Sequence, residues 1–201
     1  MPRRYENLNK IIDEINPKII IEIGTFNGNQ AINMMTEALR FHAIEKLRYI
    51  GFDLFEKPPE YEGSKPGTLP FNAVVAKLHR ALPRLRFNLI KGNTRESIAN
   101  FLGVSVGERI DIKADFVFID GGHSLDTIWN DFDLVRRYMC KSGTVIVLDD
   151  YYFDRDDKGC KPLIVEIIDD DKIEIELLDP IDKFDKPDGV LSVQFVKVTI
   201  L

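Results

Sequence analysis

The sequence predicts an α/β fold, namely a Rossmann-like doubly wound sheet of seven strands that is mostly parallel and has an antiparallel C-terminal hairpin strand. Three observations lead to this prediction. Short β-branched runs alternate with helical patterns along most of the chain, which is typical of βαβ units. Residues 18–23 are almost continuously apolar, as expected of a central parallel strand covered on both faces. Two alternating runs near the end of the chain, separated by a turn-rich stretch, predict an antiparallel hairpin.

Each element is predicted from local signals. Residues 3–15 carry apolar side chains at helical spacing and stop at Asn16-Pro17, which predicts a leading helix within residues 1–16. We expect the other parallel strands at residues 49–53, 87–90, 114–120 and 144–149. We expect the other helices at residues 29–46, 71–82, 94–102, 124–139 and 161–168. The hairpin strands are expected at residues 172–178 and 190–200, with a turn at 179–189.

The length and one long loop define the domain organisation. The 201 residues suffice for one α/β domain, which we assign to residues 1–201. A stretch rich in proline and glycine follows the second strand and interrupts the alternation, so we expect a long loop at residues 54–70. In doubly wound sheets, ligands bind at the carboxyl ends of the strands, and a loop in this place is expected to cover the site.

The composition disfavours several classes of function. A formal net charge of −6 disfavours a nucleic-acid partner and fits a small-molecule or carbohydrate acceptor better. No stretch approaches the roughly 20 apolar residues that a membrane span needs, and the first residues do not resemble a signal peptide. We therefore expect a cytoplasmic protein without a membrane partner. The two cysteines, Cys140 and Cys160, lack the spacing of a zinc site.

The first candidate site is the turn after the first strand, where Glu22 precedes the segment Gly24-Thr25-Phe26-Asn27-Gly28. Glycines in this place let the backbone approach a ligand, and the following helix offers unpaired N–H groups. The spacing is G-x-x-x-G and not the G-x-G-x-x-G of dinucleotide folds, which favours a nucleoside ligand without a diphosphate. The alternative interpretation is an ordinary tight turn between strand and helix.

Two polar residues follow the next strands. Asp53 ends the second strand, where a carboxylate can accept hydrogen bonds from both hydroxyls of a ribose; the alternative is a surface cap. Asn93 follows the third strand and could face an adenine, although a helix N-cap explains it equally well.

The densest candidate site lies after the fourth and fifth strands. Asp120, Asp149 and Asp150 end these two strands and can converge at one edge of the sheet. Three carboxylates in one cleft repel unless a positive group lies among them, and hard oxygen ligands suit Mg²⁺, which would bind and acidify an acceptor hydroxyl. His123 could take the proton of that hydroxyl. The alternatives are ordinary polar strand ends for the aspartates and a capping or metal-binding role for His123.

Four segments of the sequence together resemble a known family. They read E-I-G-T-F-N-G at residues 22–28, G-F-D-L-F-E at 51–56, F-I-D-G-G-H-S at 118–124 and K-S-G-T-V-I-V-L-D-D-Y-Y at 141–152. In this order they resemble the class I S-adenosylmethionine-dependent methyltransferases. More narrowly they resemble the group with the I-D-G-G-H signature (methyltransferase 24 type), which is related to the macrocin-type sugar O-methyltransferases. The resemblance covers roughly residues 17–152.

The resemblance implies roles for the candidate residues. Glu22, Gly24 and Gly28 would surround the methionine part of S-adenosylmethionine, and Asp53 would hold its ribose. Asp120, Asp149 and Asp150 would occupy metal-ligand positions. Macrocin-type relatives carry I-D-G-D, with the second aspartate as a proposed base, whereas this chain has Gly122 there and His123 next. His123 is therefore the substitute base to test, and solvent is the alternative.

Together these observations predict a methyltransferase that methylates an oxygen of a small molecule or sugar with the help of a bound divalent metal, Mg²⁺ or a similar ion. In our assignment, His123 and Asp120 are the catalytic residues, and the cofactor-binding set also includes Thr25, Phe26, Asn93 and Asp120. The alternative is a non-catalytic nucleoside-binding module on the same fold. A nicotinamide-dependent reductase is disfavoured by the glycine spacing. The identity of the acceptor stays open, and the leading helix and hairpin offer surfaces for a possible homodimer.

Overall fold

The computed structural model describes residues 2–55, 69–103, 111–187 and 189–201. The predicted loop at residues 54–70 lies mostly outside these described residues. Within them, no helix is both long enough and apolar enough to cross a membrane.

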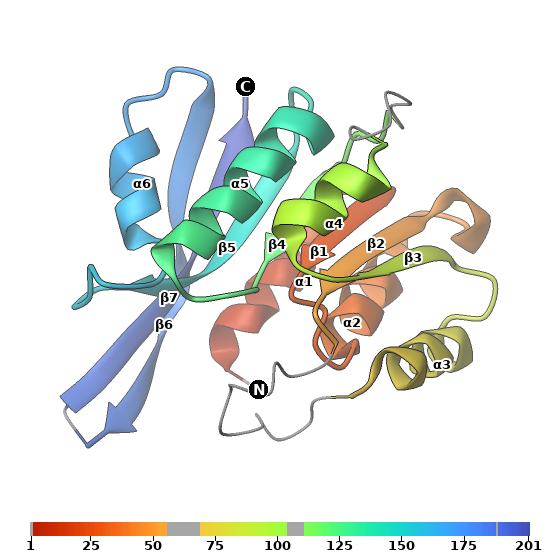
Figure 1. Ribbon diagram of the computed structural model, residues 1–201, viewed down its shortest axis with the longest axis horizontal. Coiled ribbons are helices and arrows are strands. Elements are labelled where there is room, and N and C mark those ends of the chain that lie inside the picture. The colour runs from red at the N-terminus through yellow and green to blue at the C-terminus, as the bar shows by residue number, and fades with distance from the viewer. Residues whose placement is uncertain (1, 56–68, 104–110, 188) are drawn as a thin grey trace.

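The described residues form a seven-stranded sheet in the order β3-β2-β1-β4-β5-β7-β6 (Figure 1). Its strands are β1 (Ile19–Ile23), β2 (Arg48–Asp53), β3 (Arg86–Lys91), β4 (Phe116–Ile119), β5 (Val145–Tyr152), β6 (Ile173–Lys186) and β7 (Gly189–Ile200). The strands from β3 to β5 pair in parallel, and β7 pairs antiparallel with both β5 and β6. The predicted fold class is confirmed.

Helices cover both faces of the sheet, as expected of a doubly wound fold (Figure 1). One face carries α1 (Glu6–Ile15), α2 (Asn29–Ala38) and α3 (Phe71–Ala81), whose apolar side chains share one core cluster. The other face carries α4 (Thr94–Phe101), α5 (Leu125–Met139) and α6 (Lys161–Ile167), which belong to a second cluster. Two single-turn 3₁₀ helices, η1 (Arg3–Tyr5) and η2 (Ile44–Lys46), complete the described helices.

The central strands explain why apolar runs predicted the sheet. Successive side chains of a strand point to opposite faces. In β4, Phe116 and Phe118 accordingly belong to one core cluster, and Val117 and Ile119 belong to the other. A strand buried on both faces needs an apolar residue at every position, which is the pattern read from the sequence.

Several element boundaries differ from the prediction. The helix predicted at 29–46 ends at Ala38, where the backbone tightens into i→i+3 bonds from Arg40 to Glu37 and from Phe41 to Ala38. The turn predicted at 179–189 is instead a continuation of β6 as far as Lys186. Because its residues are mostly charged or proline, this extension resembles a turn in sequence.

The end of β5 is irregular. The strand continues to Tyr152, three residues beyond the predicted end, and its register with β7 shifts between Leu148 and Tyr151. Asp150 lies inside this irregularity and has a left-handed backbone, with φ of 64°. Bulges of this kind redirect side chains at sheet edges. Here the irregularity sets the orientations of the two adjacent residues Asp149 and Asp150.

Candidate active site

The turn from β1 into α2 has the backbone geometry that its glycines predict. Gly24 and Gly28 have φ of 94° and 75°, a conformation that glycine adopts without steric cost. A Cβ atom on Gly24 would lie 2.0 Å from the carbonyl oxygen of Asp120. The turn therefore packs directly against the residue that follows β4. Phe26, between the two glycines, also has a positive φ of 52°.

Glu22 lies beneath this turn and not on its surface. Its side chain is 1% exposed and accepts a hydrogen bond from the Tyr49 hydroxyl, which lies 3.2 Å from the Thr25 hydroxyl. Burial raises the pKa of Glu22 to about 8, although the Tyr49 hydrogen bond acts in the opposite direction. Glu22 therefore supports the turn from inside the sheet, in its protonated form at neutral pH.

Asp53 connects the loops that follow β1 and β2. One carboxylate oxygen accepts a hydrogen bond from the backbone N–H of Phe26 at 2.7 Å, and the other accepts one from Phe55 at 2.6 Å. The side chain is only partly buried. These two bonds fix the orientation of the carboxylate, and each oxygen retains a lone pair for a further donor.

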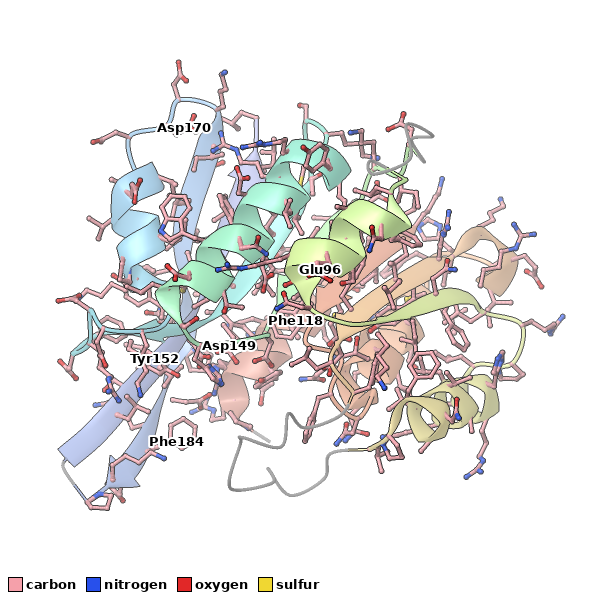
Figure 2. The ribbon with its side chains drawn as sticks, in the orientation of Figure 1. Glu96, Phe118, Asp149, Tyr152, Asp170 and Phe184 are labelled. Carbon is pink, nitrogen blue, oxygen red and sulfur yellow. The ribbon has the colours of Figure 1, made fainter. Side chains whose placement is uncertain are left out.

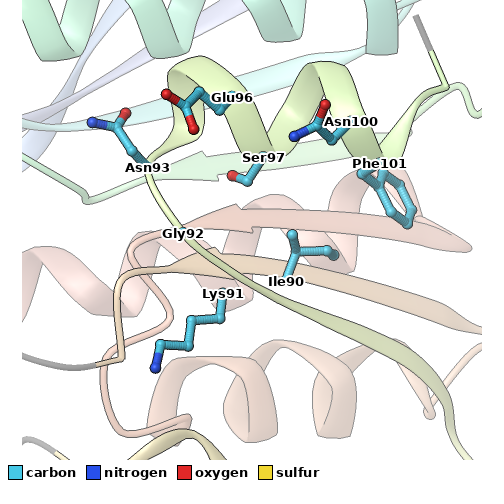
Figure 3. Close-up of a pocket in the computed structure, with 8 residues that line it drawn as sticks. All are labelled: Ile90, Lys91, Gly92, Asn93, Glu96, Ser97, Asn100 and Phe101. Carbon is cyan, nitrogen blue, oxygen red and sulfur yellow. The ribbon is translucent and has the colours of Figure 1, made fainter. Parts of the chain in front are cut away.

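Asn93 caps α4 and also lines a cavity. Its Oδ1 accepts a hydrogen bond from the backbone N–H of Arg95 at 3.0 Å, so the helix-cap interpretation is correct. The cavity, of about 250 Å³, lies between the end of β3 and α4 (Figure 3). Its lining consists of Ile90, Lys91, Gly92, Asn93, Glu96, Ser97, Asn100 and Phe101. Gly92 donates its N–H to the Asp53 carbonyl at 3.0 Å, so the cavity adjoins Asp53.

Asp120 and Asp149 come together at the carboxyl ends of β4 and β5, as predicted. The Tyr5 hydroxyl lies 2.8 Å from Oδ2 of Asp120 and 3.0 Å from Oδ2 of Asp149. One hydroxyl has one hydrogen, so a second proton is needed to make both contacts favourable. Burial and the charge of Asp149 raise the pKa of Asp120 well above its usual range. Protonated Asp120 can therefore donate to the phenol oxygen while Tyr5 donates to Asp149.

Arg4 brings a positive charge into this cluster. Its Nε and Nη2 donate to the two oxygens of Asp149 at 2.8 and 2.9 Å, and its Nη1 donates to Asp182 of β6 at 3.1 Å. Arg4 is 7% exposed, and its guanidinium lies 4.9 Å from the ring centroid of Tyr5 and 5.9 Å from that of Phe184. Figure 2 shows Asp149 where β5 reaches this edge of the sheet and Phe184 on the projecting β6–β7 hairpin.

His123 and Asp150 form a pair beside this cluster. The Nδ1 atom of His123 contacts Oδ2 of Asp150, and the Tyr152 hydroxyl donates to Oδ1 at 2.7 Å. Burial acts to raise the pKa of Asp150, but His123, Tyr152 and Arg4 together outweigh it and the pKa is lowered. The His123 side chain is 38% exposed. The pairing directs Nδ1 toward Asp150.

These contacts do not fit the divalent-metal site that the sequence predicts. Both oxygens of Asp149 bind Arg4, both oxygens of Asp150 bind His123 or Tyr152, and Asp120 binds Tyr5. Across the described ranges, no group of three or more His, Cys, Asp or Glu side chains is arranged to hold a metal ion. The aspartates converge as predicted, but the positive group among them is the guanidinium of Arg4. The metal assignment is therefore unsupported.

The sequence analysis missed four residues of this cluster: Arg4, Tyr5, Tyr152 and Asp182. Arg4 and Tyr5 begin the predicted leading helix, to whose polar residues the sequence analysis assigned no role, and Asp182 lies in the predicted turn. One signal could have found Arg4. Three converging carboxylates require a positive group, and an arginine at the start of an otherwise unassigned helix can supply it.

Comparison with known proteins identifies the family. The family model described as a methyltransferase domain matches residues 21–151, which is more than half of the chain. An uncharacterized protein, R132 of Acanthamoeba polyphaga mimivirus, is 29% identical over 150 residues, or 75% of this chain. The match spans 59% of the length of that viral protein.

Solved structures share the fold. An O-methyltransferase from Bacillus cereus in complex with SAH has a TM-score of 0.68 at 16% identity, covering 100% of this chain and 82% of that chain. The O-methyltransferase TomG from Streptomyces achromogenes, involved in tomaymycin synthesis and in complex with SAM, has a TM-score of 0.64 at 14% identity, covering 98% and 78%. A putative rRNA-methylase from Clostridium thermocellum has a TM-score of 0.65 at 16% identity, covering 100% and 97%.

At these identities the likeness to solved structures establishes the fold. The family model covers most of β1 and extends through most of β5, and it includes the first three quoted motifs and all of the fourth except Tyr152. The chain belongs to the class I S-adenosylmethionine-dependent methyltransferases.

Proposed function

We propose that this chain transfers the methyl group of S-adenosylmethionine to an oxygen atom of a small-molecule or carbohydrate acceptor. The observation that carries the proposal is the His123–Asp150 pair, which lies at the same edge of the sheet as the turn after β1. A positioned imidazole is the group that oxygen methylation needs, because a hydroxyl must lose its proton as its oxygen attacks. Metal assistance is not part of the proposal, because the carboxylates already bind protein groups.

The residues near Gly24 fit the cofactor. Asp53 presents two fixed acceptor oxygens, which suit the paired hydroxyls of a ribose. The cavity beside it, lined by Asn93 and Ser97, fits an adjoining base, and the buried Ser97 hydroxyl has no hydrogen-bond partner among the described residues. Gly24 brings the first turn close to the end of β4. These features support a nucleoside ligand that lies across the carboxyl ends of β1, β2 and β3.

The chain's own residues contribute positioning and proton transfer. When bound, S-adenosylmethionine supplies a methyl group on a positively charged sulfur, which leaves with the bonding electron pair as S-adenosylhomocysteine. Nε2 of His123 takes the proton of the acceptor hydroxyl as its oxygen bonds to the methyl carbon. Asp150 holds the imidazole through Nδ1 and stabilises the positive charge that results.

The test is a binding and turnover experiment on the whole chain. Isothermal titration with S-adenosylhomocysteine is compared with titration by NADH, and we expect heat of binding from the first compound alone. Asp53→Ala should weaken S-adenosylhomocysteine binding at least tenfold, while the matched surface variant Asp126→Ala should bind like wild type. Absence of S-adenosylhomocysteine binding to the wild type at millimolar concentration would refute the proposal.

The same binding and turnover assays distinguish two alternative functions. A non-catalytic module would bind S-adenosylhomocysteine but release none from S-adenosylmethionine when offered phenols, catechols and sugars. An RNA acceptor, suggested by the fold shared with a putative rRNA-methylase, would be methylated in place of these compounds. The net charge of −6 favours the small acceptor.

A further inference from the structure

Arg4 is bound in a way that differs from an ordinary surface arginine. All three guanidinium nitrogens donate hydrogen bonds, two to Asp149 and one to Asp182. The two side chains of the Arg4–Asp149 ion pair are 8% and 2% exposed. Planar, bidentate pairing of this kind is the geometry for which arginine is suited and lysine is not. The Arg4–Asp149 ion pair is therefore buried and held in one geometry within the cluster.

The chain before α1 is also fixed in place. Asp182 accepts hydrogen bonds from the backbone N–H groups of Arg3 at 3.0 Å and Arg4 at 3.1 Å, in addition to the one from the Arg4 side chain. This contact depends on the extension of β6, where Asp182 pairs with Val193 of β7. The hairpin thus anchors the backbone from which Arg4 reaches Asp149.

A divalent cation would compete for the same lone pairs. Mg²⁺ and Mn²⁺ bind carboxylate oxygens directly and at short distance, so a shared ion among Asp120, Asp149 and Asp150 needs oxygens that face one another. Asp149 directs both of its oxygens to Arg4, and Asp150 directs its two to His123 and Tyr152. A divalent ion bound to the same carboxylates would also lie close to the guanidinium of Arg4, and the two positive charges would repel each other.

We infer that Arg4 takes the place of the divalent metal in this carboxylate cluster, so that the site carries its own cation and methyl transfer is independent of added metal. Arg4 is in this sense a positioning residue. It neutralises Asp149, which receives the Tyr5 hydrogen bond and lies next to the Asp150 that holds His123. The part of this inference that concerns catalysis rests on the proposed function, whereas the part that concerns metal binding does not.

The test measures Mn²⁺ binding by electron paramagnetic resonance of the free ion, with the whole chain and S-adenosylhomocysteine present. We expect no stoichiometric binding to the wild type below 1 mM. Arg4→Met removes the charge but keeps much of the apolar stem, and it should bind Mn²⁺ at least tenfold more tightly than the wild type. Arg3→Met, which changes the exposed neighbouring arginine, should behave like the wild type.

A thermal-unfolding measurement accompanies the binding data and covers the case in which Arg4→Met folds poorly. When Mn²⁺ replaces EDTA in the buffer, the midpoint temperature of unfolding should rise for Arg4→Met and stay unchanged for the wild type. One equivalent of Mn²⁺ bound tightly to the wild type, or wild-type turnover abolished by EDTA and restored by Mg²⁺, would overturn the inference. Failure of the proposed function would instead appear as missing S-adenosylhomocysteine binding in the same samples.

Discussion

The carbonyl oxygen of Asp120 occupies the space into which a side chain on Gly24 would project. A Cβ atom on Gly24 would lie 2.0 Å from that oxygen and 2.9 Å from the Cα of Gly121. Both neighbours are backbone atoms, so they cannot rotate away as a flexible side chain can. The first turn and the end of β4 can therefore lie this close only if residue 24 is glycine.

Gly24→Ala is expected to destabilise the protein by about 3 kcal/mol or more, since it adds a backbone clash to an unfavourable φ. Gly143 provides a matched control, because its φ of 84° is similar and a Cβ there meets nothing within 4 Å. Gly143→Ala should cost only about 1–2 kcal/mol, the penalty of the left-handed backbone itself. Urea denaturation of both variants checks this, and equal losses would contradict the clash.

Glu22 is expected to make stability depend on pH. Its pKa is about 8 in the folded protein and close to 4.5 when exposed, so the folded state keeps a proton that the unfolded state loses between these values. This contribution to the free energy of unfolding is complete below about pH 4.5 and falls by about 1.4 kcal/mol per pH unit as the pH rises toward 8. Glu22→Gln cannot ionise and should remove this slope.

Urea unfolding of the wild type and Glu22→Gln at pH 5, 6, 7 and 8 measures the difference directly. The isosteric amide keeps the size of the side chain and can still accept the Tyr49 hydrogen bond. Glu14→Gln, on the exposed face of α1, is the control and should follow the wild type at each pH. If Glu22→Gln shows the same pH dependence as the wild type, Glu22 does not retain its proton on folding.

The sheet and the glycine turn could be predicted because their causes are local. A strand buried on both faces needs consecutive apolar residues, and β4 supplies four of them. The positive φ of Gly24 and Gly28 follows from the turn that joins β1 to α2. The convergence of Asp120 and Asp149 follows from parallel pairing of β4 with β5, which places both carboxyl ends at one edge.

The partners of the aspartates could not be predicted in the same way. Arg4 and Asp149 are 145 residues apart in the chain, and no local pattern relates them. Asp182 lies in a stretch of charged residues and prolines that resembles a turn, and only pairing with β7 makes it a strand. The metal prediction has no support in these contacts, and it did not consider that a side chain could supply the positive charge that the carboxylates require.

Tyr5→Phe is expected to destabilise the protein by about 1–3 kcal/mol, because it leaves the partly buried Asp120 and the buried Asp149 without their shared hydroxyl. The ring itself packs edge-on against Phe195 at 5.1 Å and would be retained in phenylalanine. Tyr138→Phe on α5, which removes a hydroxyl away from the cluster, should cost less than about 0.5 kcal/mol. Thermal unfolding of the two variants measures this difference. Equal losses of stability would contradict the shared hydrogen bonds of Tyr5 with Asp120 and Asp149.

His123→Ala is expected to lower turnover by about 10²–10⁴-fold at saturating substrates, the range in which a positioned general base contributes. The dissociation constant of S-adenosylhomocysteine should change less than about threefold, because removing a base that acts only in the transition state leaves ground-state binding intact. His42→Ala is the control, since His42 is only partly buried and its Nε2 contacts the carbonyl of Asn16, away from the acidic cluster.

Asp150→Asn completes the test of this dyad. The amide keeps the shape of the side chain but loses the charge that stabilises protonated His123, so turnover should fall to a level between those of the wild type and His123→Ala. If Asp150 acts only through His123, adding Asp150→Asn to His123→Ala should reduce turnover no further. A further tenfold loss in the double variant would show that Asp150 contributes to the reaction independently of the imidazole, which would contradict a role for Asp150 through His123 alone.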